Sequence, residues 1–361
     1  MIIGIDGNEA NVDELVGVSV YTKNLLSYFQ KQASSNLQFE IFLKEKPKAS
    51  LPPETKDFKY KVVGPSFLWS QISLPLALKN TNLDVFFSPA HYAPRYLSKP
   101  LVVTIHDLSY FYYPEEFLKK DLHKLTHWTK YSVEKAKKVI AVSENTKKDL
   151  MKFYNVPENK ISVIYNGFEK NVPSSKFQAQ NSSEPYFLYV GTLQPRKNLK
   201  ALIKAFNEFK KNNPEYKLKI VGKKGWIFED IFSLVDELKL TEEITFEGFV
   251  SDDKLVNLYK NAHGFVLPSF YEGFGIPILE AMSYGCPVIA SNTSSLPEVG
   301  EDACLYFDPK NVNELVKRME ESKNPELRGK LIDKGLERVK KFSWEKSAKE
   351  TLRIIKSAVS Q

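Results

Sequence analysis

The stretch 269–290 carries two glutamates on either side of a glycine-containing turn. Glu272 and Glu280 stand eight positions apart (280 − 272 = 8). An ionised carboxylate only accepts hydrogen bonds, and its two oxygens match a pair of neighbouring hydroxyls that both donate. Sugars and riboses carry such pairs. The alternative is that Glu272 is a solvated loop residue and Glu280 an exposed helix residue.

The turn between the glutamates has the features of an anion site. We expect a helix to start near Gly275 or Ile276, with Pro277 in its first turn, where a missing N–H costs nothing. Gly273 and Gly275 lack a Cβ, so a ligand can approach their backbone N–H groups closely, and the helix dipole favours negative charge. A phosphate fits this turn. A ligand with hydroxyls on both sides of a diphosphate is a sugar nucleotide.

Two cations follow the apolar run 186–191. Arg196 and Lys197 lie just before a helical pattern, where we expect them to face the same anion as the 273–276 turn. Negative charge builds on a departing diphosphate in the transition state, and fixed cations stabilise it. The alternative is a solvated pair of surface cations.

The first half of the chain offers further candidates. Gly17 precedes a helical pattern, so Gly17 and Val18 could present main-chain N–H groups to a phosphate; helix capping is the alternative. His106 ends a β-branched run, and a neutral imidazole there could hydrogen-bond a sugar oxygen or a phosphate. The alternative is a structural histidine, with Asp107 capping the next segment. His91 is a further candidate of the same kind.

Several motifs are absent from the sequence. It contains neither G-x-G-x-x-G nor G-x-x-x-x-G-K-[ST], which disfavours dinucleotide dehydrogenases and P-loop NTPases. It also contains no D-x-D triplet. A site that holds a diphosphate without paired acidic ligands relies on Arg, Lys and helix ends, so we expect no required divalent metal and no other cofactor.

The elements that must position these residues alternate between short β-branched runs and helical patterns. Such alternation predicts an α/β protein with mostly parallel sheets covered by helices. Ligands of such sheets bind beyond the carboxyl ends of the strands, and with two sheets we expect the site in a cleft between them. The expected strands are 2–6, 39–44, 58–63, 84–88, 101–106, 138–143 and 161–165, then 186–191, 217–222, 243–248, 263–268 and 287–291.

The domain organisation follows from where this alternation stops. Residues 171–185 lose periodicity and are rich in Asn, Ser, Pro and Gln, which predicts a linker. It separates a first α/β domain over 1–170 from a second over 186–342. The segment 343–361 predicts a final amphipathic helix.

Composition limits the function classes without choosing among them. The 361 residues are 42% hydrophobic and 26% charged, with a net charge of 51 − 44 = +7, which suits anionic ligands. Cys286 and Cys304 show no metal-type spacing and no disulfide framework. Asp6 and Glu9 interrupt the first apolar run, and no run approaches bilayer length. We therefore expect a cytoplasmic protein.

The segment 110–153 mixes aromatic residues with many lysines. It could dock peripherally on anionic lipid headgroups at the inner face of a membrane and reach a lipid-linked saccharide. The alternative is a solvated helix face whose apolar side lies in the core. We expect no nucleic-acid partner, because the basic excess is small and no recognition motif occurs.

In chain order, six motifs resemble the retaining GT-B glycosyltransferases of family 4. The resemblance spans nearly the whole chain, and the E-x₇-E segment is its most specific part. The motifs are the Gly17 loop, HD at 106–107, NGF at 166–168, GTLQPRKN at 191–198, EGFV at 247–250 and EGFGIPILE at 272–280.

The resemblance implies two Rossmann-like domains that face each other across a cleft. It places the donor mainly on the C-terminal domain and the acceptor on the N-terminal one, to which the final helix crosses back. By position, Glu272 would contact the hydroxyls of the donor sugar, Glu280 the ribose and Lys197 the diphosphate. The further implied donor contacts are the turn residues Gly273, Phe274, Gly275 and Ile276, and the base-binding loop residues Gly248, Phe249 and Val250.

One position departs from the family pattern. Many members have Arg directly after the glycine where this sequence has Thr192. Arg196 would supply that cation from the opposite side of the loop, as in similar enzymes that read GTLEPRKN, many of them linked to mannose transfer. This favours GDP-mannose as the donor.

Together these observations predict a retaining hexosyltransferase of cell-surface polysaccharide or glycolipid synthesis. It would transfer a hexose to a hydroxyl of a saccharide or lipid-linked saccharide. The favoured hexose is mannose, with GDP-mannose as the donor. Glu272, Arg196, Lys197 and His106 are the expected catalytic residues. The alternatives are a GT-B-like sugar-nucleotide epimerase, a non-catalytic sugar-nucleotide binding protein, and a glycosidase, which also uses two carboxylates but has no use for a cationic phosphate loop.

Overall fold

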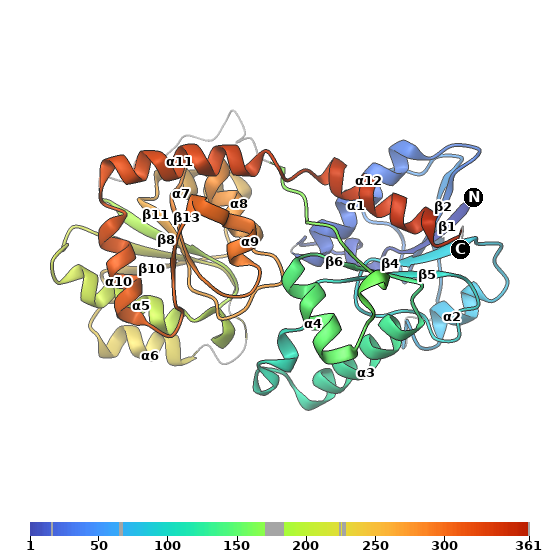
Figure 1. Ribbon diagram of the computed structural model, residues 1–361, viewed down its shortest axis with the longest axis horizontal. Coiled ribbons are helices and arrows are strands. Elements are labelled where there is room, and N and C mark those ends of the chain that lie inside the picture. Colours follow the sequence, from blue (N-terminus) through green and yellow to red (C-terminus); the bar gives the residue numbers. More distant parts are fainter. Residues whose placement is uncertain (16, 65–67, 170–183, 224, 226–228, 360–361) are drawn as a thin grey trace. The chain divides into compact units, whose positions relative to one another are not determined.

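The chain folds into two compact units, each built on a parallel sheet (Figure 1). The structure is a computed structural model that describes residues 1–361 except 16, 65–67, 170–183, 224, 226–228 and 360–361. Unit 1 comprises Met1–Gly167 and Phe342–Gln361, and unit 2 comprises Phe168–Lys341. The prediction of an α/β protein with two Rossmann-like, doubly wound domains is confirmed. Residues 171–183 of the predicted linker lie outside the described residues.

Unit 1 contains a seven-stranded parallel sheet in the order β3-β2-β1-β4-β5-β6-β7. Each strand lies within one of the runs predicted from the sequence or is displaced from it by one residue. The strands are β1 (Ile2–Asp6), β2 (Gln38–Leu43), β3 (Phe58–Val62), β4 (Val85–Ser88), β5 (Leu101–Ile105), β6 (Lys138–Ala141) and β7 (Ile161–Val163).

Helices cover both faces of this sheet because successive side chains of a strand point to opposite faces. Phe87 packs in a core cluster with α1 and α12, whereas Phe86, its neighbour in β4, packs in a second cluster with α2, α3 and α4. Both phenylalanines are fully buried. The helices of unit 1 are α1 (Val18–Gln32), α2 (Ser73–Leu78), α3 (Lys119–Lys135), α4 (Glu144–Tyr154) and α12 (Trp344–Ser357).

Helix α12 returns to unit 1 from the end of the chain, as the resemblance implied. Its side chains Ala348 and Ile355 are fully buried in the cluster that contains α1. The hydroxyl of Ser343 caps the helix by accepting a hydrogen bond from the N–H of Lys346 (3.3 Å). The last helix therefore completes the core of the first unit.

Unit 2 contains a six-stranded parallel sheet in the order β10-β9-β8-β11-β12-β13. Strand β13 was not predicted, because its four residues CLYF form a short apolar run that a helix could equally carry. The strands are β8 (Tyr186–Val190), β9 (Lys217–Val221), β10 (Ile244–Gly248), β11 (Gly264–Leu267), β12 (Val288–Ser291) and β13 (Cys304–Phe307).

Two groups of helices flank the sheet of unit 2, with α5, α6 and α10 on one side and α7, α8, α9 and α11 on the other (Figure 1). In α5 the residues Leu202, Ala205, Phe206 and Phe209 are buried at helical spacing. The helices are α5 (Leu199–Lys210), α6 (Glu229–Glu237), α7 (Asp252–Asn261), α8 (Ile276–Ser283), α9 (Leu296–Gly300), α10 (Val312–Glu321) and α11 (Pro325–Val339).

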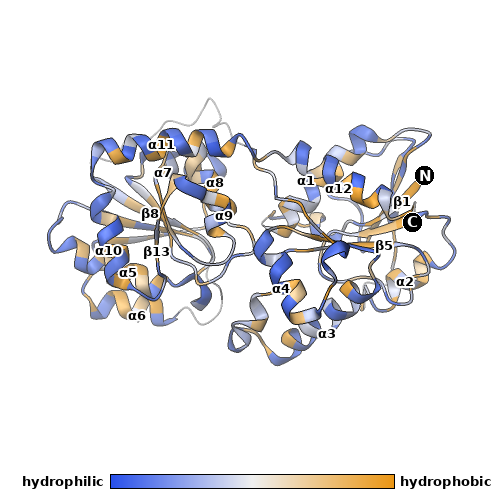
Figure 2. Cartoon of the chain, viewed as in Figure 1, coloured by the Kyte–Doolittle hydropathy of each residue, from blue (hydrophilic) through white to orange (hydrophobic). Residues whose placement is uncertain are grey.

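Hydrophobic residues concentrate in the strands, whereas helices such as α10 and α11 carry hydrophobic and hydrophilic residues in alternation (Figure 2). None of the helices in the described part of the chain combines the length and hydrophobicity needed to span a bilayer. Short 3-10 helices complete the description: η1 (Asn8–Ala10), η2 (Ser109–Phe111), η3 (Pro114–Glu116), η4 (Glu158–Lys160), η5 (Pro195–Lys197) and η6 (Glu301–Ala303).

Candidate active site

Most of the predicted site residues lie at one edge of the sheet of unit 2. Its paired strands are all parallel, so the loops after their carboxyl ends emerge together. The loop after β8 carries residues 191–198, the loop after β10 starts at Phe249, and the loop after β11 carries residues 268–275. Residues far apart in the sequence therefore meet at this edge.

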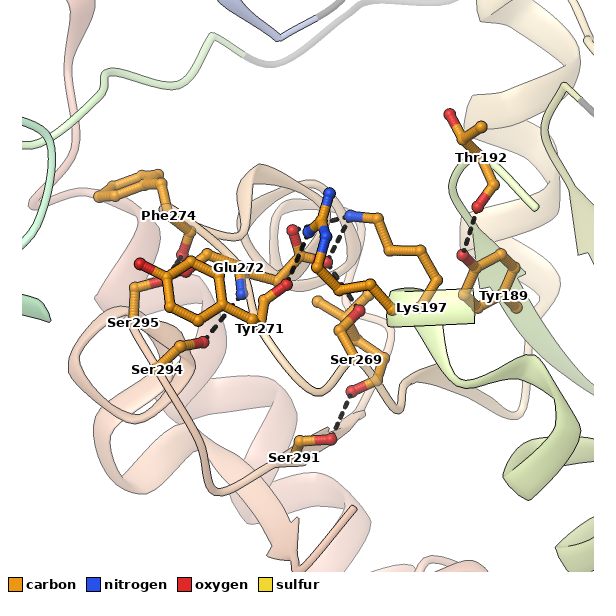
Figure 3. Close-up of polar contacts among 12 residues, drawn as sticks. Tyr189, Thr192, Lys197, Ser269, Tyr271, Glu272, Phe274, Ser291, Ser294 and Ser295 are labelled. Atoms are coloured by element: carbon orange, nitrogen blue, oxygen red, sulfur yellow. Dashed lines mark hydrogen bonds and ion pairs between the residues drawn. The ribbon is translucent and has the colours of Figure 1, made fainter. Parts of the chain in front are cut away.

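An ion pair between Lys197 and Glu272 lies at the centre of this edge (Figure 3). The Lys197 ammonium donates to both carboxylate oxygens of Glu272, at 2.6 Å to Oε1 and 2.8 Å to Oε2. The two side chains are only 15% and 12% exposed. Lys197 comes from η5 and Glu272 from the loop between β11 and α8, so the pair joins two of the loops.

Serine hydroxyls hold the Glu272 loop in place. Ser269 Oγ donates to Glu272 Oε1 (2.7 Å), and the N–H of Glu272 donates to Ser294 Oγ (2.9 Å). The hydroxyl of Ser295 lies 2.9 Å from the carbonyl oxygens of both Glu272 and Phe274, to which it donates. Figure 3 shows these serines around the loop that carries the carboxylate.

Arg196 supports the same loop through the backbone. Its Nη1 donates to the carbonyl oxygen of Tyr271 (2.8 Å), and its own carbonyl oxygen accepts from the N–H of Phe270 (2.9 Å). The Nε of Arg196 is buried and has no hydrogen-bond partner among the described residues. One N–H of this guanidinium is thus left to bind an acceptor at this edge.

The cations keep Glu272 ionised despite its burial. Burial raises the pKa of the carboxyl, but the charges of Lys197 and Arg196 and the hydrogen bonds from Lys197 and Ser269 outweigh it. The pKa of Glu272 is therefore lowered. A carboxylate in this state accepts hydrogen bonds and does not donate a proton.

Helix α8 begins at Ile276 with Pro277 in its first turn, as predicted. Gly275 precedes it with φ +100°, a conformation that L side chains rarely adopt, and an added Cβ would lie 2.7 Å from Leu296 Cδ2. Gly273 and Phe274 complete the turn, where Phe274 is 4% exposed. Only the three turn residues 273–275 therefore separate Glu272 from the N-terminus of α8.

Glu280 occupies a different electrostatic setting on α8. Its Oε2 accepts a hydrogen bond from the hydroxyl of Tyr259 in α7 (2.8 Å). Burial raises the pKa of Glu280, the Tyr259 hydrogen bond opposes this, and the charge of Asp252 adds to the rise. The pKa of Glu280 is therefore raised overall. The two glutamates of the E-x₇-E segment therefore differ in how strongly each holds a proton.

Further predicted residues lie at the same edge. Phe249 follows β10 and is 59% exposed, and the ammonium of Lys223 lies 4.7 Å from the centre of its ring. Gly248 has φ +67° and Val250 continues the loop. Thr192 is exposed, and its carbonyl oxygen accepts from the hydroxyl of the buried Tyr189 (3.2 Å).

His106 belongs to unit 1, at the carboxyl end of β5. Its Nε2 lies 2.8 Å from the carbonyl oxygen of Pro89, which can only accept, so Nε2 carries the proton and Nδ1 is left as the acceptor. Burial and the neighbouring His91 lower the pKa of His106 to about 4, against the opposing effects of Pro89 and Asp107. The imidazole is therefore neutral at physiological pH.

The ring of His106 also packs against an aromatic neighbour, and Asp107 bonds to the segment that follows. The imidazole ring meets that of Tyr21 edge-on at 4.8 Å, and the Asp107 carboxylate accepts from the N–H of Ser109 (3.0 Å). Gly17 lies directly before α1 with φ +51°, and Val18 is the first residue of that helix. These residues of unit 1 are placed by their own sheet and helix.

Sequence reasoning missed the residues that hold the site. Ser294 and Ser295 lie in the polar loop after β12, and inspecting the residues after each expected strand would have found them. Ser294 is also in the left-handed region with φ +53°. Tyr259 lies in the last turns of α7, where no sequence signal singled it out. Asn198 ends the motif GTLQPRKN, but no role was predicted for its side chain.

Within the described residues there is no cluster of three or more His, Cys, Asp or Glu side chains that could hold a metal ion. The two cations Arg196 and Lys197 and the N-terminus of α8 lie at this edge of unit 2.

The two parallel-sheet units and the returning helix define a GT-B glycosyltransferase fold. The model for Glycosyltransferase Family 4 matches residues 16–171, and the model for Glycosyl transferases group 1 matches residues 173–338. The chain belongs to this glycosyltransferase family. Its enzyme class is that of the hexosyltransferases.

Two relatives illustrate the family. The chain is 33% identical over 297 residues to O-antigen chain mannosyltransferase B of Escherichia coli, which covers 78% of this chain and 76% of the relative. It is 35% identical over 238 residues to O-antigen chain mannosyltransferase RfbU of Salmonella typhimurium, covering 66% of this chain and 64% of the relative.

Solved structures share the fold at low sequence identity. Sucrose-phosphate synthase from Thermosynechococcus elongatus superimposes with a TM-score of 0.77 at 20% identity, over 99% of each chain. Anabaena HepE in complex with UDP-glucose superimposes with a TM-score of 0.74 at 19% identity, also over 99% of each chain.

Proposed function

We propose that this enzyme transfers a hexose from a nucleoside diphosphate sugar to a hydroxyl of a saccharide or lipid-linked saccharide, with retention at the anomeric carbon. Mannose from GDP-mannose is the proposed donor, because relatives over most of the chain are mannosyltransferases. The observation that carries the proposal is the Lys197–Glu272 pair directly before the N-terminus of α8. It combines a cation and an anion-binding helix end with a carboxylate that accepts sugar hydroxyls.

Donor binding would rearrange this ion pair. Lys197 occupies both oxygens of Glu272. When a donor enters, its sugar hydroxyls would donate to Glu272, and the Lys197 ammonium would turn to the diphosphate. Arg196 already has one unpaired N–H for the same anion. Each charge exchanges one partner for another, so neither is left buried without compensation.

The transfer step then needs positioning and charge stabilisation. The bond between the anomeric carbon and the diphosphate oxygen breaks, and the bond to the acceptor oxygen forms on the same face. The acceptor proton passes to the departing phosphate oxygen. Arg196, Lys197 and the N–H groups of the Gly273–Ile276 turn would stabilise the negative charge on the leaving diphosphate, so no metal is required. The neutral imidazole of His106 would accept a sugar hydroxyl at Nδ1.

The remaining donor contacts are part of the same proposal. Glu280 would bind the ribose, and the exposed ring of Phe249 would stack on the base with Gly248 and Val250 beside it. The main chain of Thr192 would line the diphosphate loop, and Gly17 and Val18 would offer N–H groups to a phosphate.

The acceptor and the cell compartment are part of the proposal. The two relatives named above are O-antigen chain enzymes, which supports cell-surface polysaccharide synthesis in the cytoplasm. In unit 1, Leu118 is 66% exposed and precedes the exposed cations Lys119 and Lys120, and Tyr112 is 41% exposed, with the ammonium of Lys152 5.0 Å from the centre of its ring. This surface is suited to peripheral contact with anionic lipids, which would bring a lipid-linked acceptor to the enzyme.

The test measures binding and transfer separately. Thermal unfolding of the full chain is followed with GDP, UDP, ADP and their hexose conjugates, in EDTA and then with Mg²⁺. A ligand at about 100 times its Kd adds about 2.7 kcal/mol to the free energy of unfolding. We expect stabilisation by GDP and GDP-mannose in EDTA. Transfer to saccharide acceptors is then followed by NMR, which reports the anomeric configuration of the product.

Each rival interpretation predicts a different result. Conversion of the donor sugar without an acceptor would support an epimerase, and binding without turnover would support a sensor protein. Stabilisation only with Mg²⁺ would contradict the metal-free site. Inversion at the anomeric carbon would contradict retention. Preferential binding of UDP and its hexose conjugates would contradict GDP-mannose as the donor.

A further inference from the structure

Tyr259 is a buried residue of α7 whose hydroxyl contacts Glu280. It is 1% exposed, and its ring is packed edge-on against Phe265 of β11 at 5.6 Å and stacked with Tyr284 at 6.0 Å. These contacts fix the position of the ring. The hydroxyl donates its proton to Glu280 Oε2 at 2.8 Å. Because the ring cannot move, this hydrogen bond also fixes the torsion of the Glu280 carboxylate.

The two oxygens of Glu280 differ in their contacts. Oε2 is held by Tyr259, whereas Oε1 accepts no hydrogen bond from the described residues. Glu280 is half-buried, and Oε1 does not belong to the buried atoms that lack a partner. One oxygen is thus committed to the protein and the other is open to a ligand in a fixed direction.

From this arrangement we infer that Tyr259 is a positioning residue that aims the Glu280 carboxylate at the ribose diol of the donor nucleotide. The inference rests on the proposed function, because it takes Glu280 as the ribose ligand. An aimed carboxylate discriminates a ribose from a sugar without those hydroxyls better than a mobile one does, since less torsional freedom is lost on binding.

The same hydroxyl also affects the charge of Glu280. The titratable groups that act on Glu280 are Tyr259 and Asp252, both in α7, and those that act on Tyr259 include Cys286 and Tyr284. Burial and Asp252 raise the pKa of Glu280, and the Tyr259 hydrogen bond lowers it. Without the hydroxyl the pKa of Glu280 rises further, so protonation competes with the ribose hydroxyls at a higher pH.

The test uses Tyr259→Phe in the full chain, which keeps the ring and removes only the hydroxyl. Binding of GDP and of 2′,3′-dideoxy-GDP is measured by calorimetry between pH 5.5 and 8. For the native chain we expect GDP to bind at least about tenfold more tightly than the dideoxy form. For Tyr259→Phe we expect GDP binding at pH 7 to weaken about tenfold, with little change for the dideoxy form.

The pH profile separates positioning from a purely structural effect. Binding to the native chain should weaken as the pH falls through the pKa of Glu280, and for Tyr259→Phe this loss should begin at a higher pH. The β-phosphate of GDP titrates in the same way with both proteins, so their difference isolates Glu280. In a Glu280→Gln background, which has no carboxyl to titrate, Tyr259→Phe should leave the pH profile unchanged.

Tyr186→Phe is the matched control. The Tyr186 hydroxyl is also buried and donates to α7, at the carbonyl oxygen of Leu258 (2.8 Å), but it does not contact Glu280. We expect it to retain the preference for GDP over the dideoxy form.

The outcomes distinguish this inference from the proposed function. If the native chain binds GDP and Tyr259→Phe keeps both its ribose preference and its pH profile, the positioning role is wrong and the donor site stands. If Tyr186→Phe loses the preference equally, the effect is structural and the inference is also wrong. If the native chain binds neither GDP nor UDP, the donor site fails, and the role of Tyr259 fails with it.

Discussion

The two glutamates of the turn perform opposite electrostatic tasks at the scale of single residues. Glu272 is buried against cations that lower its pKa, whereas burial and Asp252 raise the pKa of Glu280. A buried ion pair is worth little relative to an apolar replacement, but breaking it by removing one partner is costly. We therefore expect the Glu272 carboxylate to stabilise the fold. We expect the Glu280 carboxylate to destabilise it while contributing to nucleotide binding.

The Lys197–Glu272 pair should show strong coupling in a double-mutant cycle. We expect Lys197→Met and Glu272→Gln each to lower the free energy of unfolding of unit 2 by about 3 kcal/mol, because each leaves a buried polar group without its partner. The double variant should lose about 1–3 kcal/mol less than the sum. The urea dependence of amide hydrogen exchange in β11 and α8 measures the free energy of unfolding of unit 2 alone.

An exposed pair provides the control. The Nζ of Lys200 lies 2.6 Å from Oδ2 of Asp230, and the two side chains are 52% and 64% exposed. A double-mutant cycle on this pair should therefore give a coupling energy of about 1 kcal/mol or less. Equal coupling in the two pairs would contradict the argument that burial decides the strength of the Lys197–Glu272 interaction.

Glu272→Gln and Glu280→Gln should have opposite pH-dependent effects on stability. The folded pKa of Glu272 lies below its ordinary value of 4.5, so its contribution is fully present above pH 4.5 and is lost as the pH falls through the lower folded value. Glu272→Gln should thus be most destabilising near neutral pH. The folded pKa of Glu280 lies above 4.5, so its ionisation destabilises the fold above that pKa.

Glu280→Gln should accordingly stabilise unit 2 at pH 7 by roughly 0.5–1 kcal/mol while it weakens nucleotide binding. This gain should vanish as the pH falls toward 4.5. Hydrogen exchange in α8 at pH 7 and at pH 5 measures both variants on one scale. A destabilised Glu280→Gln at pH 7 would show that the carboxylate has stabilising contacts beyond Tyr259.

At the scale of elements, the site depends on loops that hold one another. Asn198 lies between η5 and α5 with φ +57°, and its Nδ2 donates to the carbonyl oxygens of Pro268 (3.1 Å) and Pro309 (2.8 Å). It is 7% exposed. This one side chain ties the loop of Lys197 to the loop of Glu272.

Two substitutions of Asn198 separate its amide from its backbone. Asn198→Gly removes both hydrogen bonds but tolerates the left-handed conformation, and should cost about 1–3 kcal/mol. Asn198→Ala should cost about 1 kcal/mol more, because it adds backbone strain. Both variants should weaken GDP binding, because a change in the position of this loop also displaces Lys197. Equal stability of the two variants by urea unfolding would contradict a strained backbone at this position.

The sequence specified the elements better than the contacts between them. Strands such as β8, expected over 186–191 and found at Tyr186–Val190, were predicted because β-branched and aromatic runs are local signals. The start of α8 followed from Gly275 and Pro277. In contrast, the contact of Tyr259 with Glu280 depends on how α7 packs beside α8, which no local pattern encodes. Their positions after predicted strands put Lys197 and Glu272 at the same edge of the sheet, but only the fold shows that they pair.

At the scale of the whole molecule, the chain begins and ends in the same unit. Helix α12 packs with α1 in the core of unit 1, although α11, which precedes it, belongs to unit 2. A large apolar side chain removed from α12 should therefore weaken the unit that holds the N-terminus and leave the proposed donor-binding unit intact.

Ile355→Ala tests this division. Ile355 is fully buried, so its truncation should lower the free energy of unfolding of unit 1 by about 2–5 kcal/mol. Hydrogen exchange should accelerate in β1 and β4 and stay unchanged in β11, and the Kd for GDP should be retained. Leu331→Ala in α11, where the side chain is 5% exposed, is the matched control and should accelerate exchange in β11 while β1 stays protected. Faster exchange in β11 of Ile355→Ala would mean that the two units unfold as one cooperative body, because the loss of a side chain in one core would then weaken the other.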